Sequence, residues 1–203
     1  AFDPQSPYEN RDKRFYRAIL ANGMSFKDYT IETFKGGADD GIVSQGGSPT
    51  GYFLRKYIQE ATSFEPGKEA VSKHHWVIYR YAETLLTYAE SMVNAFNEVR
   101  KNADMPLIPS MGKEDFLERL YNEWRVEFAF EDHRFWDVRR WKIADTTQRE
   151  LYGVKIEKQA DGTFNFYKNL YETRNWRDCM YLYPIPQSEL YKNTNLNPQN
   201  TGW

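Results

Sequence analysis

The stretch KEDFLERLYNEWRVEFAFEDHRFWDVRRWK, residues 113–142, has the clearest helical pattern in the chain. Large apolar residues recur at a uniform spacing of four, which predicts one buried stripe on a helix from residue 113 to about 131. The stripe comprises Phe116, Leu120, Trp124 and Phe128. Glu114 and Asp115 lie in the first turn, where carboxylates complement the helix dipole. Residues 131–142 are expected to form a further, shorter helix.

A second periodic segment precedes this stretch. Apolar residues between residues 74 and 101 recur every seven positions, and a second seam runs beside them. The two seams are Ile78, Leu85, Met92 and Val99, and Ala82, Ala89 and Phe96. This spacing predicts one long amphipathic helix over 74–101. Two prolines and a glycine in residues 105–112 break the helix, so the two helices are expected to pair antiparallel. The pair is similar to one tetratricopeptide repeat, although no second copy recurs.

The C-terminal segment, residues 146–203, has a different pattern. Polar and apolar residues alternate over 154–157 and 164–172, and Asp161-Gly162 between them is a strong hairpin signal. An irregular tail follows, and its terminal Trp203 indicates that the tail docks somewhere. This segment therefore predicts a small β-hairpin and an irregular tail.

The N-terminal segment, residues 1–73, is expected to be rich in loops, since seven glycines lie between residues 23 and 51. Residues 74–145 hold the helical hairpin and the short helix. The predicted fold class is mainly α, with a tetratricopeptide-like antiparallel helix pair, irregular loops and a small β-hairpin.

Composition argues against several classes of protein. The chain has 203 residues, with 27 Lys plus Arg, 29 Asp plus Glu and a formal net charge of −2. This balance argues against nucleic-acid binding, and no apolar stretch approaches the roughly 20 residues of a membrane helix. The single cysteine, Cys179, excludes an internal disulfide and a cysteine-based zinc site. Aromatic residues make up 17% of a chain of mean hydropathy −0.80, which indicates a core of rings or a surface for stacking.

Three carboxylates recur at intervals of four on the helix over 113–131: Glu123, Glu127 and Glu131. Paired carboxylates are the groups that hydrolyse glycosides, and Glu/His clusters hold metals, but the sequence has Glu131-x-His133 where a di-iron site needs Glu-x-x-His. The preferred interpretation is an ion-paired helix face. Its expected partners are Arg119, Arg125 and Arg134. We therefore expect no catalytic residue, metal or cofactor, and a glycosidase using Glu127 or Glu131 is a weaker alternative.

The segment FWDVRRWK, residues 135–142, is expected to have a structural role. Its aromatic residues should share a face with Val138, and Asp137 is spaced to bond Arg140 or Arg134. A guanidinium stacked on indole while paired with a carboxylate is a stabilising arrangement. Arg and aromatic side chains also recognise RNA, but the net charge disfavours that use. The residues assigned to this structural group are Trp124, Glu131, Arg134, Trp136, Asp137, Arg140 and Trp141.

The glycine-rich loop carries candidate ligand-binding residues. They are Phe26, Tyr29, Phe34, Asp39 and Asp40. Sugars stack on aromatic rings while carboxylates bond their hydroxyl groups, and binding loops on a rigid scaffold hold such sites. The alternative, equally supported by the sequence, is a loop whose rings pack onto the helices.

Five segments, taken in order, carry a resemblance to a known family. They are SPYENRDKRFY, TGYFLRKYI, YRYAETLLTYAESM, NEWRVEFAFEDHRFWDVRRWK and YLYPIPQSELYKN…NLNPQNTGW. The ordered set resembles the C-terminal region of the SusD/RagB family, outer-membrane nutrient-binding lipoproteins of Bacteroidetes. The resemblance implies a helical fold with tetratricopeptide-like pairs and ligand sites in variable loops, here residues 24–49. The family more often has glycine at position 132, where this chain has Asp132.

The resemblance also implies a function and a location. The expected role is capture of a glycan or oligosaccharide, or a peptide in some members, and its transfer without cleavage to a SusC-like TonB-dependent transporter. The N-terminal half of the same protein is expected to precede this chain and to carry the lipid anchor that holds it at the surface of the outer membrane. The alternative function is a helical-repeat adaptor that binds peptides or proteins.

Overall fold

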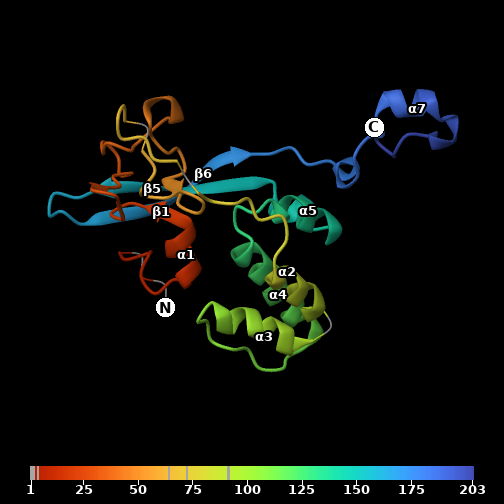
Figure 1. The fold of residues 1–203 in the computed structure, drawn as a ribbon, viewed down its shortest axis with the longest axis horizontal. Coiled ribbons are helices and arrows are strands. Elements are labelled where there is room, and N and C mark those ends of the chain that lie inside the picture. Colours follow the sequence, from red (N-terminus) through yellow and green to blue (C-terminus); the bar gives the residue numbers. More distant parts are fainter. Residues whose placement is uncertain (1–2, 4, 64, 72, 91) are drawn as a thin grey trace.

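The computed structural model describes residues 3, 5–63, 65–71, 73–90 and 92–203, and within them the chain is mostly helical with small two-stranded antiparallel sheets (Figure 1). The helices are α1 (Lys13–Ala18), α2 (Tyr81–Ala89), α3 (Val93–Asn102), α4 (Lys113–Glu127), α5 (His133–Arg140), α6 (Ala144–Thr147) and α7 (Gln187–Lys192). The strands are β1 (Ile19–Ala21), β2 (Ser25–Phe26), β3 (Tyr29–Thr30), β4 (Tyr52–Leu54), β5 (Glu150–Lys158) and β6 (Phe164–Thr173). Short 3₁₀ turns are η1 (Val43–Gln45), η2 (Asp178–Tyr181) and η3 (Thr194–Leu196). The predicted mainly α class with a small β-hairpin is confirmed, and the tetratricopeptide likeness stays a prediction.

The hydrophobic core lies where α2, α3 and α4 pack together. Its buried residues are Leu86, Ala89, Ala95, Phe96, Val99, Ile108, Phe116, Leu120, Trp124 and Phe128. The last four are the stripe predicted for α4, which is therefore confirmed. Phe96 of α3 meets Phe116 of α4 edge to face, with ring centroids 5.5 Å apart. Each fully buried ring of this kind contributes about 1.5–3 kcal/mol to folding.

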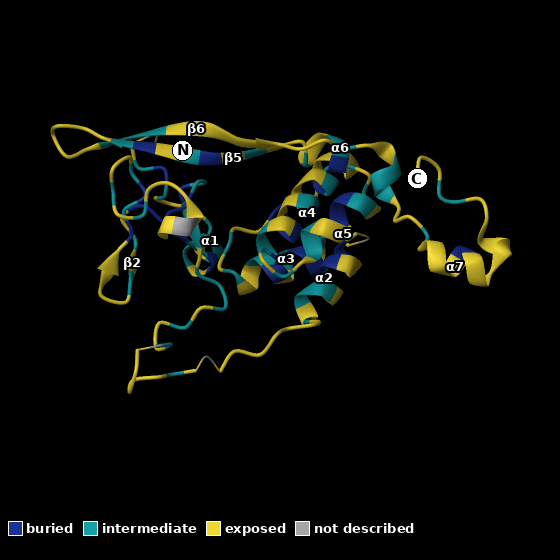
Figure 2. Ribbon diagram, turned by 90° about the horizontal axis from the view of Figure 1, so that it is seen from above, coloured by how far each residue is buried: buried dark blue, intermediate teal, exposed yellow. Residues whose placement is uncertain are grey.

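The single long helix predicted over residues 74–101 is wrong. The chain instead forms α2 and α3, and Met92 between them is extended; residue 91 lies outside the described residues. Residues 73–79 are exposed and non-helical (Figure 2), so Ile78, expected in the stripe, is 88% exposed. Arg80 is extended because its guanidinium reaches α4. The break between α2 and α3 allows each short helix to bury its own apolar face against α4. One straight helix with a narrow apolar stripe would not bury both faces.

The junction between α4 and α5 is a tight turn. Helix α4 ends at Glu127, four residues earlier than predicted, and the turn passes through Phe130 at φ 64°. Asp132 has φ 63° and ψ −1°, in the left-handed region where asparagine, aspartate and glycine are favoured. The short helix expected over 131–142 is present as α5.

The β5–β6 hairpin supports the glycine-rich loop. It turns at Asp161-Gly162 as predicted, with Gly162 at φ 86°. The Lys35 N–H donates to the Ile156 carbonyl at 2.7 Å, and the Val154 N–H donates to the Thr50 carbonyl at 2.8 Å. Gly153 permits this approach, since a Cβ there would lie 2.6 Å from the Thr50 Cα. Both ends of the loop are therefore fixed to β5.

The C-terminal tail extends away from the helical core and carries α7 at its far end (Figure 1). The tail folds back on itself, and the Trp203 Nε1–H donates to the carbonyls of Cys179 at 2.9 Å and Leu182 at 3.1 Å. The prediction that Trp203 docks is confirmed. Among the helices described here, none combines the length and the apolar character needed to cross a bilayer.

Candidate ligand-binding site

The β2–β3 hairpin brings two of the predicted ligand-binding rings together. Phe26 is the cross-strand partner of Tyr29. Residues directly opposite each other on antiparallel strands project to the same face, so the side chains of Phe26 and Tyr29 leave the hairpin on the same side. The two-residue turn between them requires a positive φ, which Lys27 adopts at 52°. Tyr29 is 44% exposed, so its ring is accessible to another molecule.

Asp39 fixes the orientation of Tyr29. Its Oδ2 accepts hydrogen bonds from the Tyr29 hydroxyl at 2.9 Å and from the Glu32 N–H at 2.7 Å. The hydrogen bond to a carboxylate favours the protonated phenol and raises the Tyr29 pKa. The structure therefore joins Phe26, Tyr29 and Asp39 into one group, which we call the hairpin platform.

The other two predicted residues have different surroundings. The Phe34 ring packs on Phe164 of β6, with centroids 5.5 Å apart, and the Lys158 ammonium lies 5.1 Å from its centroid. Asp40 is exposed and accepts a hydrogen bond from the Gly36 N–H at 2.9 Å. Phe34 is thus half-buried, but against the β5–β6 hairpin and not against the helices on which the alternative interpretation expected the loop rings to pack. Asp40 stabilises a turn.

The three glutamates predicted on one helix face belong to a network of ion pairs, with Glu123 and Glu127 on α4 and Glu131 in the turn after it. Arg14 bonds Glu123 at 2.7 Å and Glu127 at 2.6 Å, and Arg80 bonds Glu127 at 2.5 Å. The remaining contacts pair Arg100 with Glu123 at 2.8 Å, Arg80 with Glu131 at 2.8 Å and Lys56 with Glu131 at 2.5 Å. The preferred ion-paired interpretation agrees with this geometry, but the partners come from other elements and not from the expected Arg119, Arg125 and Arg134.

The pairs with Arg80 and Lys56 favour the charged form of the Glu131 carboxylate. Burial alone would raise the pKa of Glu131, but hydrogen bonds from Arg80 and Lys56 outweigh it and lower that pKa. A general acid in glycoside hydrolysis needs a raised pKa instead. The geometry of Glu131 therefore suits an ion pair and not proton donation.

The structural group on α5 has its expected centre. The Asp137 Oδ1 accepts a hydrogen bond from the Arg140 Nε at 2.9 Å. The Arg140 guanidinium lies 4.4 Å from the Trp141 ring centroid and 4.9 Å from that of Trp124, and it also bonds Glu90 at 2.8 Å. Of the two partners considered for Asp137, the structure selects Arg140 over Arg134.

Trp136 does not share this face. The segment was expected to place Phe135, Trp136, Val138 and Trp141 together, but Val138 is buried while Trp136 is 57% exposed. The reason is helical geometry, because residues two positions apart lie on nearly opposite sides of a helix. The expectation of one continuous aromatic face is wrong.

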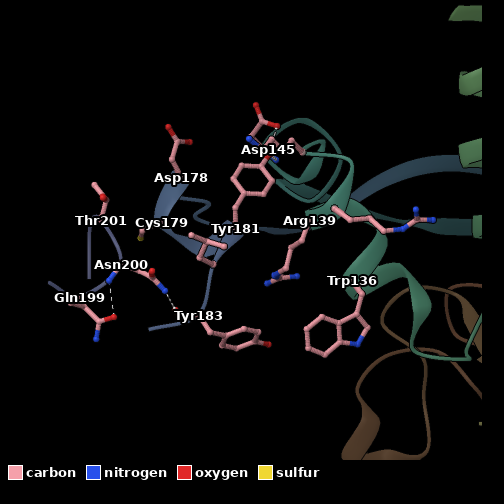
Figure 3. A pocket seen from close by; sticks show the side chains of 13 residues that line it. Trp136, Arg139, Asp145, Asp178, Cys179, Tyr181, Tyr183, Gln199, Asn200 and Thr201 are labelled. Carbon is pink, nitrogen blue, oxygen red and sulfur yellow. Dashed lines mark hydrogen bonds between the residues drawn. The ribbon is translucent and has the colours of Figure 1, made fainter. Parts of the chain in front are cut away.

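Trp136 instead borders an open cavity of about 1100 Å³ between α5 and the C-terminal tail (Figure 3). Arg139 also comes from α5, Asp178, Tyr181 and Tyr183 come from residues 178–183, and Asn200 comes from the end of the tail. Sequence reasoning missed this cavity. The one local signal in the sequence was the spacing of Trp136 and Val138. Residues two apart lie on nearly opposite sides of a helix, so a buried Val138 leaves Trp136 exposed.

Comparison with known proteins identifies the family. The profile of the SusD family matches residues 2–203, so this chain belongs to the SusD family. It is 31% identical over 151 residues to the SusD-like protein P2 of Formosa agariphila, an alignment that covers 65% of this chain and 26% of that protein.

Solved structures agree with this assignment. A crystal structure of a SusD-like protein from Bacteroides fragilis has a TM-score of 0.79 at 32% identity, covering 98% of this chain and 40% of that one. A SusD superfamily protein from Bacteroides vulgatus shares the fold, with a TM-score of 0.58 at 22% identity over 96% of this chain and 40% of that one. The chain thus spans about a quarter of the length of the P2 protein and two fifths of each structure.

The family defines the general class of function. SusD-like proteins are generally non-enzymatic binding proteins of the outer-membrane surface that acquire nutrients by binding glycans. In the part of the chain that the structure describes, no group of three or more His, Cys, Asp or Glu side chains is arranged to hold a metal ion. The hairpin platform and the cavity beside α5 are candidates for a ligand-binding site.

Proposed function

We propose that this chain is part of a cell-surface protein that captures a glycan or oligosaccharide and delivers it to a SusC-like TonB-dependent transporter without cleaving it. The observation that carries the proposal is the match of the SusD family profile to residues 2–203. In this proposal the protein is held at the outer membrane by a lipid anchor on a segment that precedes residues 1–203.

The hairpin platform is the proposed contact with the glycan. A sugar presents an apolar face of C–H groups that packs on an aromatic ring, and the exposed Tyr29 ring, with Phe26 beside it, offers such a surface. Asp39 holds the Tyr29 hydroxyl before a ligand arrives, which lowers the entropy cost of binding. Phe34 and Asp40 are proposed to contact the edge of the bound glycan. Asp40 would do so with its exposed carboxylate and Phe34 with its partly exposed ring.

The proposal of binding without cleavage is supported by the ion pairs of α4. Glu127 accepts from two arginines and Glu131 from Arg80 and Lys56, so their carboxylates are occupied. If reducing sugar were released by the wild type and the release were lost in Glu127→Gln or Glu131→Gln, the non-catalytic proposal would be wrong.

The test is affinity electrophoresis of the full-length ectodomain and of residues 1–203, in parallel, against a panel of soluble polysaccharides. We expect one glycan to retard the wild type. Tyr29→Ala should weaken that binding about tenfold, which corresponds to roughly 1.4 kcal/mol. Tyr29→Phe keeps the ring and loses only the hydrogen bond to Asp39, so a smaller loss of glycan affinity is expected. Tyr171→Ala, which removes an exposed tyrosine of β6, is the matched control.

Each outcome has a distinct meaning. Retardation of the wild type that Tyr29→Ala leaves unchanged would remove the hairpin platform from the site and keep the function. If no glycan retards either form and a polypeptide binds instead, the alternative of a helical adaptor would replace glycan capture.

A further inference from the structure

The cavity between α5 and the C-terminal tail exposes a second set of aromatic rings. The Trp136 ring centroid lies 6.0 Å from that of Tyr183 and 5.1 Å from that of Phe135. Although these rings adjoin one another, Trp136 remains 57% exposed and Tyr183 55% exposed. Clustered rings with this much accessible surface offer a stacking face on the side of the cavity (Figure 3).

Hydrogen bonds within the tail, and one from α5, hold the residues around Tyr183. The Asn200 Nδ2 donates to the Tyr183 carbonyl at 2.6 Å, and the Gln199 side chain bonds both the N–H and the carbonyl of Ile185, at 2.7 and 2.8 Å. The Arg139 Nε donates to the Met180 carbonyl at 3.2 Å, which joins the tail to α5. The geometry of the cavity is therefore set before any ligand binds, a condition that favours affinity.

Polar groups with unused hydrogen-bonding capacity line the same cavity. The Arg139 guanidinium lies 3.6 Å from the Phe135 ring centroid, and within the described ranges no carboxylate forms an ion pair with it. Asp178 is exposed and forms no ion pair with any described cation. The Thr201 hydroxyl is also exposed at the cavity. Arg139 thus lies next to the rings, and Asp178 and Thr201 line the opposite end of the cavity (Figure 3).

The charges of the lining nearly cancel. Arg140 is paired with Glu90 and Asp137 outside the cavity, which leaves Arg139 and Lys142 against Asp145 and Asp178. A site for a strongly anionic ligand would carry an excess of cations. A balanced lining with a carboxylate at the surface favours an uncharged ligand rich in hydroxyl groups.

We propose that this cavity is a second saccharide subsite, separate from the hairpin platform, for an uncharged oligosaccharide. A sugar ring stacks on Trp136 and Tyr183 and accepts a hydrogen bond from Arg139, and a further unit of the same oligosaccharide donates to Asp178 at the other end of the cavity. The cavity volume of about 1100 Å³ is at the upper end of small-molecule sites, about 300–1,000 Å³, which suits several sugar units better than one. This inference rests on the proposed glycan-binding function and adds to it the subsite and the charge class of the glycan.

The test uses the full-length ectodomain in affinity electrophoresis, with a neutral α-glucan, a neutral β-glucan, a mannan and polygalacturonate as probes. Trp136→Ala and Tyr183→Ala should each weaken binding of the retarding neutral glycan about tenfold, and Asp178→Asn about threefold. Trp76→Ala removes another exposed tryptophan, remote from the cavity, and should leave binding unchanged. Thermal unfolding of each variant separates lost binding from lost folding, and Asp178→Asn is the variant least able to disturb the fold.

Four results would overturn the proposal. If Tyr29→Ala abolishes retardation while Trp136→Ala and Asp178→Asn bind like the wild type, the glycan-binding function stands and the second subsite does not exist. If Trp136→Ala only lowers the unfolding temperature and Asp178→Asn binds normally, the rings serve packing. If polygalacturonate alone retards the wild type, the charge class is wrong. Absence of retardation by any glycan would remove the proposed function itself, and the subsite with it.

Discussion

Helices α4 and α5 both carry aromatic residues, yet the two sets have opposite surroundings. Phe116, Trp124 and Phe128 of α4 are at most 8% exposed, whereas Phe135 and Trp136 of α5 are 43% and 57% exposed. The α4 rings lie in the core with α2 and α3. On α5, Trp136 lines the cavity beside the tail, and the Phe135 ring packs against Trp136. The same residue types therefore stabilise the fold in one helix and form an accessible surface in the next.

The difference follows from what each helix packs against. Helix α4 is covered by two helices, so a stripe with a spacing of four is buried along its whole length. On α5 the polar centre takes the buried side, where Asp137 and Arg140 meet Trp124 and Trp141. The exposed rings then remain on the opposite side, toward the tail. Ring content alone does not separate a core from a binding surface, whereas the position of each ring around its helix does.

The largest expected effect tests the buried set. Phe96→Ala removes a ring that is 1% exposed and packed on Phe116, so it should lower the free energy of unfolding by about 3–5 kcal/mol. Trp136→Ala removes an exposed ring and should change the free energy of unfolding by at most about 0.5 kcal/mol. Urea denaturation followed by circular dichroism measures both. Similar losses in the two variants would break the distinction between the ring sets.

The next largest expected effect concerns the ion pairs that Arg14 makes with α4. Arg14 bonds Asp12, Glu123 and Glu127 with a side chain that is only 13% exposed. Arg14→Met leaves buried carboxylates with fewer cations and should cost about 3 kcal/mol of stability. Lys13→Met, at the neighbouring residue, breaks a pair with Asp104 whose side chains are 58% and 69% exposed, and should cost at most about 0.5 kcal/mol. A small loss for Arg14→Met would show that the network contributes little to the fold.

The sequence predicts a helix or hairpin well where the residues that stabilise it lie close together in the chain and follow a regular spacing. The α4 stripe and the β5–β6 hairpin follow from spacing and from Asp161-Gly162. The helix predicted over 74–101 begins only at Tyr81, because Arg80 is extended and held by Glu127 and Glu131, far along the chain, and no periodicity reports such a pair. In the same way the Arg14–Glu123 pair joins residues 109 positions apart, so the expected local arginines were the wrong partners.

The candidate site shows the same limit. Residue types and the glycine-rich context selected Tyr29 and Asp39, which the fold does bring together, because a short loop joins them. Phe34 has the same type and context, yet it packs on Phe164 of a distant strand. The cavity beside α5 combines Trp136 with Tyr183 and Asn200 from the tail, and that contact depends on how the tail folds back. Local sequence therefore names candidates for a site, and tertiary packing decides which of them meet.

The smallest effect concerns the turn that separates the two ring sets. Asp132 has φ 63° and makes no side-chain cap to α5, so its backbone conformation is the main constraint at this position. Asp132→Gly and Asp132→Ala both remove the carboxylate, and any loss of its interaction with the helix dipole is common to both. The two variants differ in how well they tolerate the left-handed conformation. For alanine this conformation costs about 1–2 kcal/mol of stability. Glycine avoids that strain, but the greater entropy of its unfolded state lowers stability by about 0.4–1 kcal/mol. Asp132→Gly should therefore be more stable than Asp132→Ala by about 1 kcal/mol in urea denaturation. Equal stabilities would mean that the turn relaxes to another conformation, and α5 would then not need a left-handed residue to direct Trp136 toward the tail.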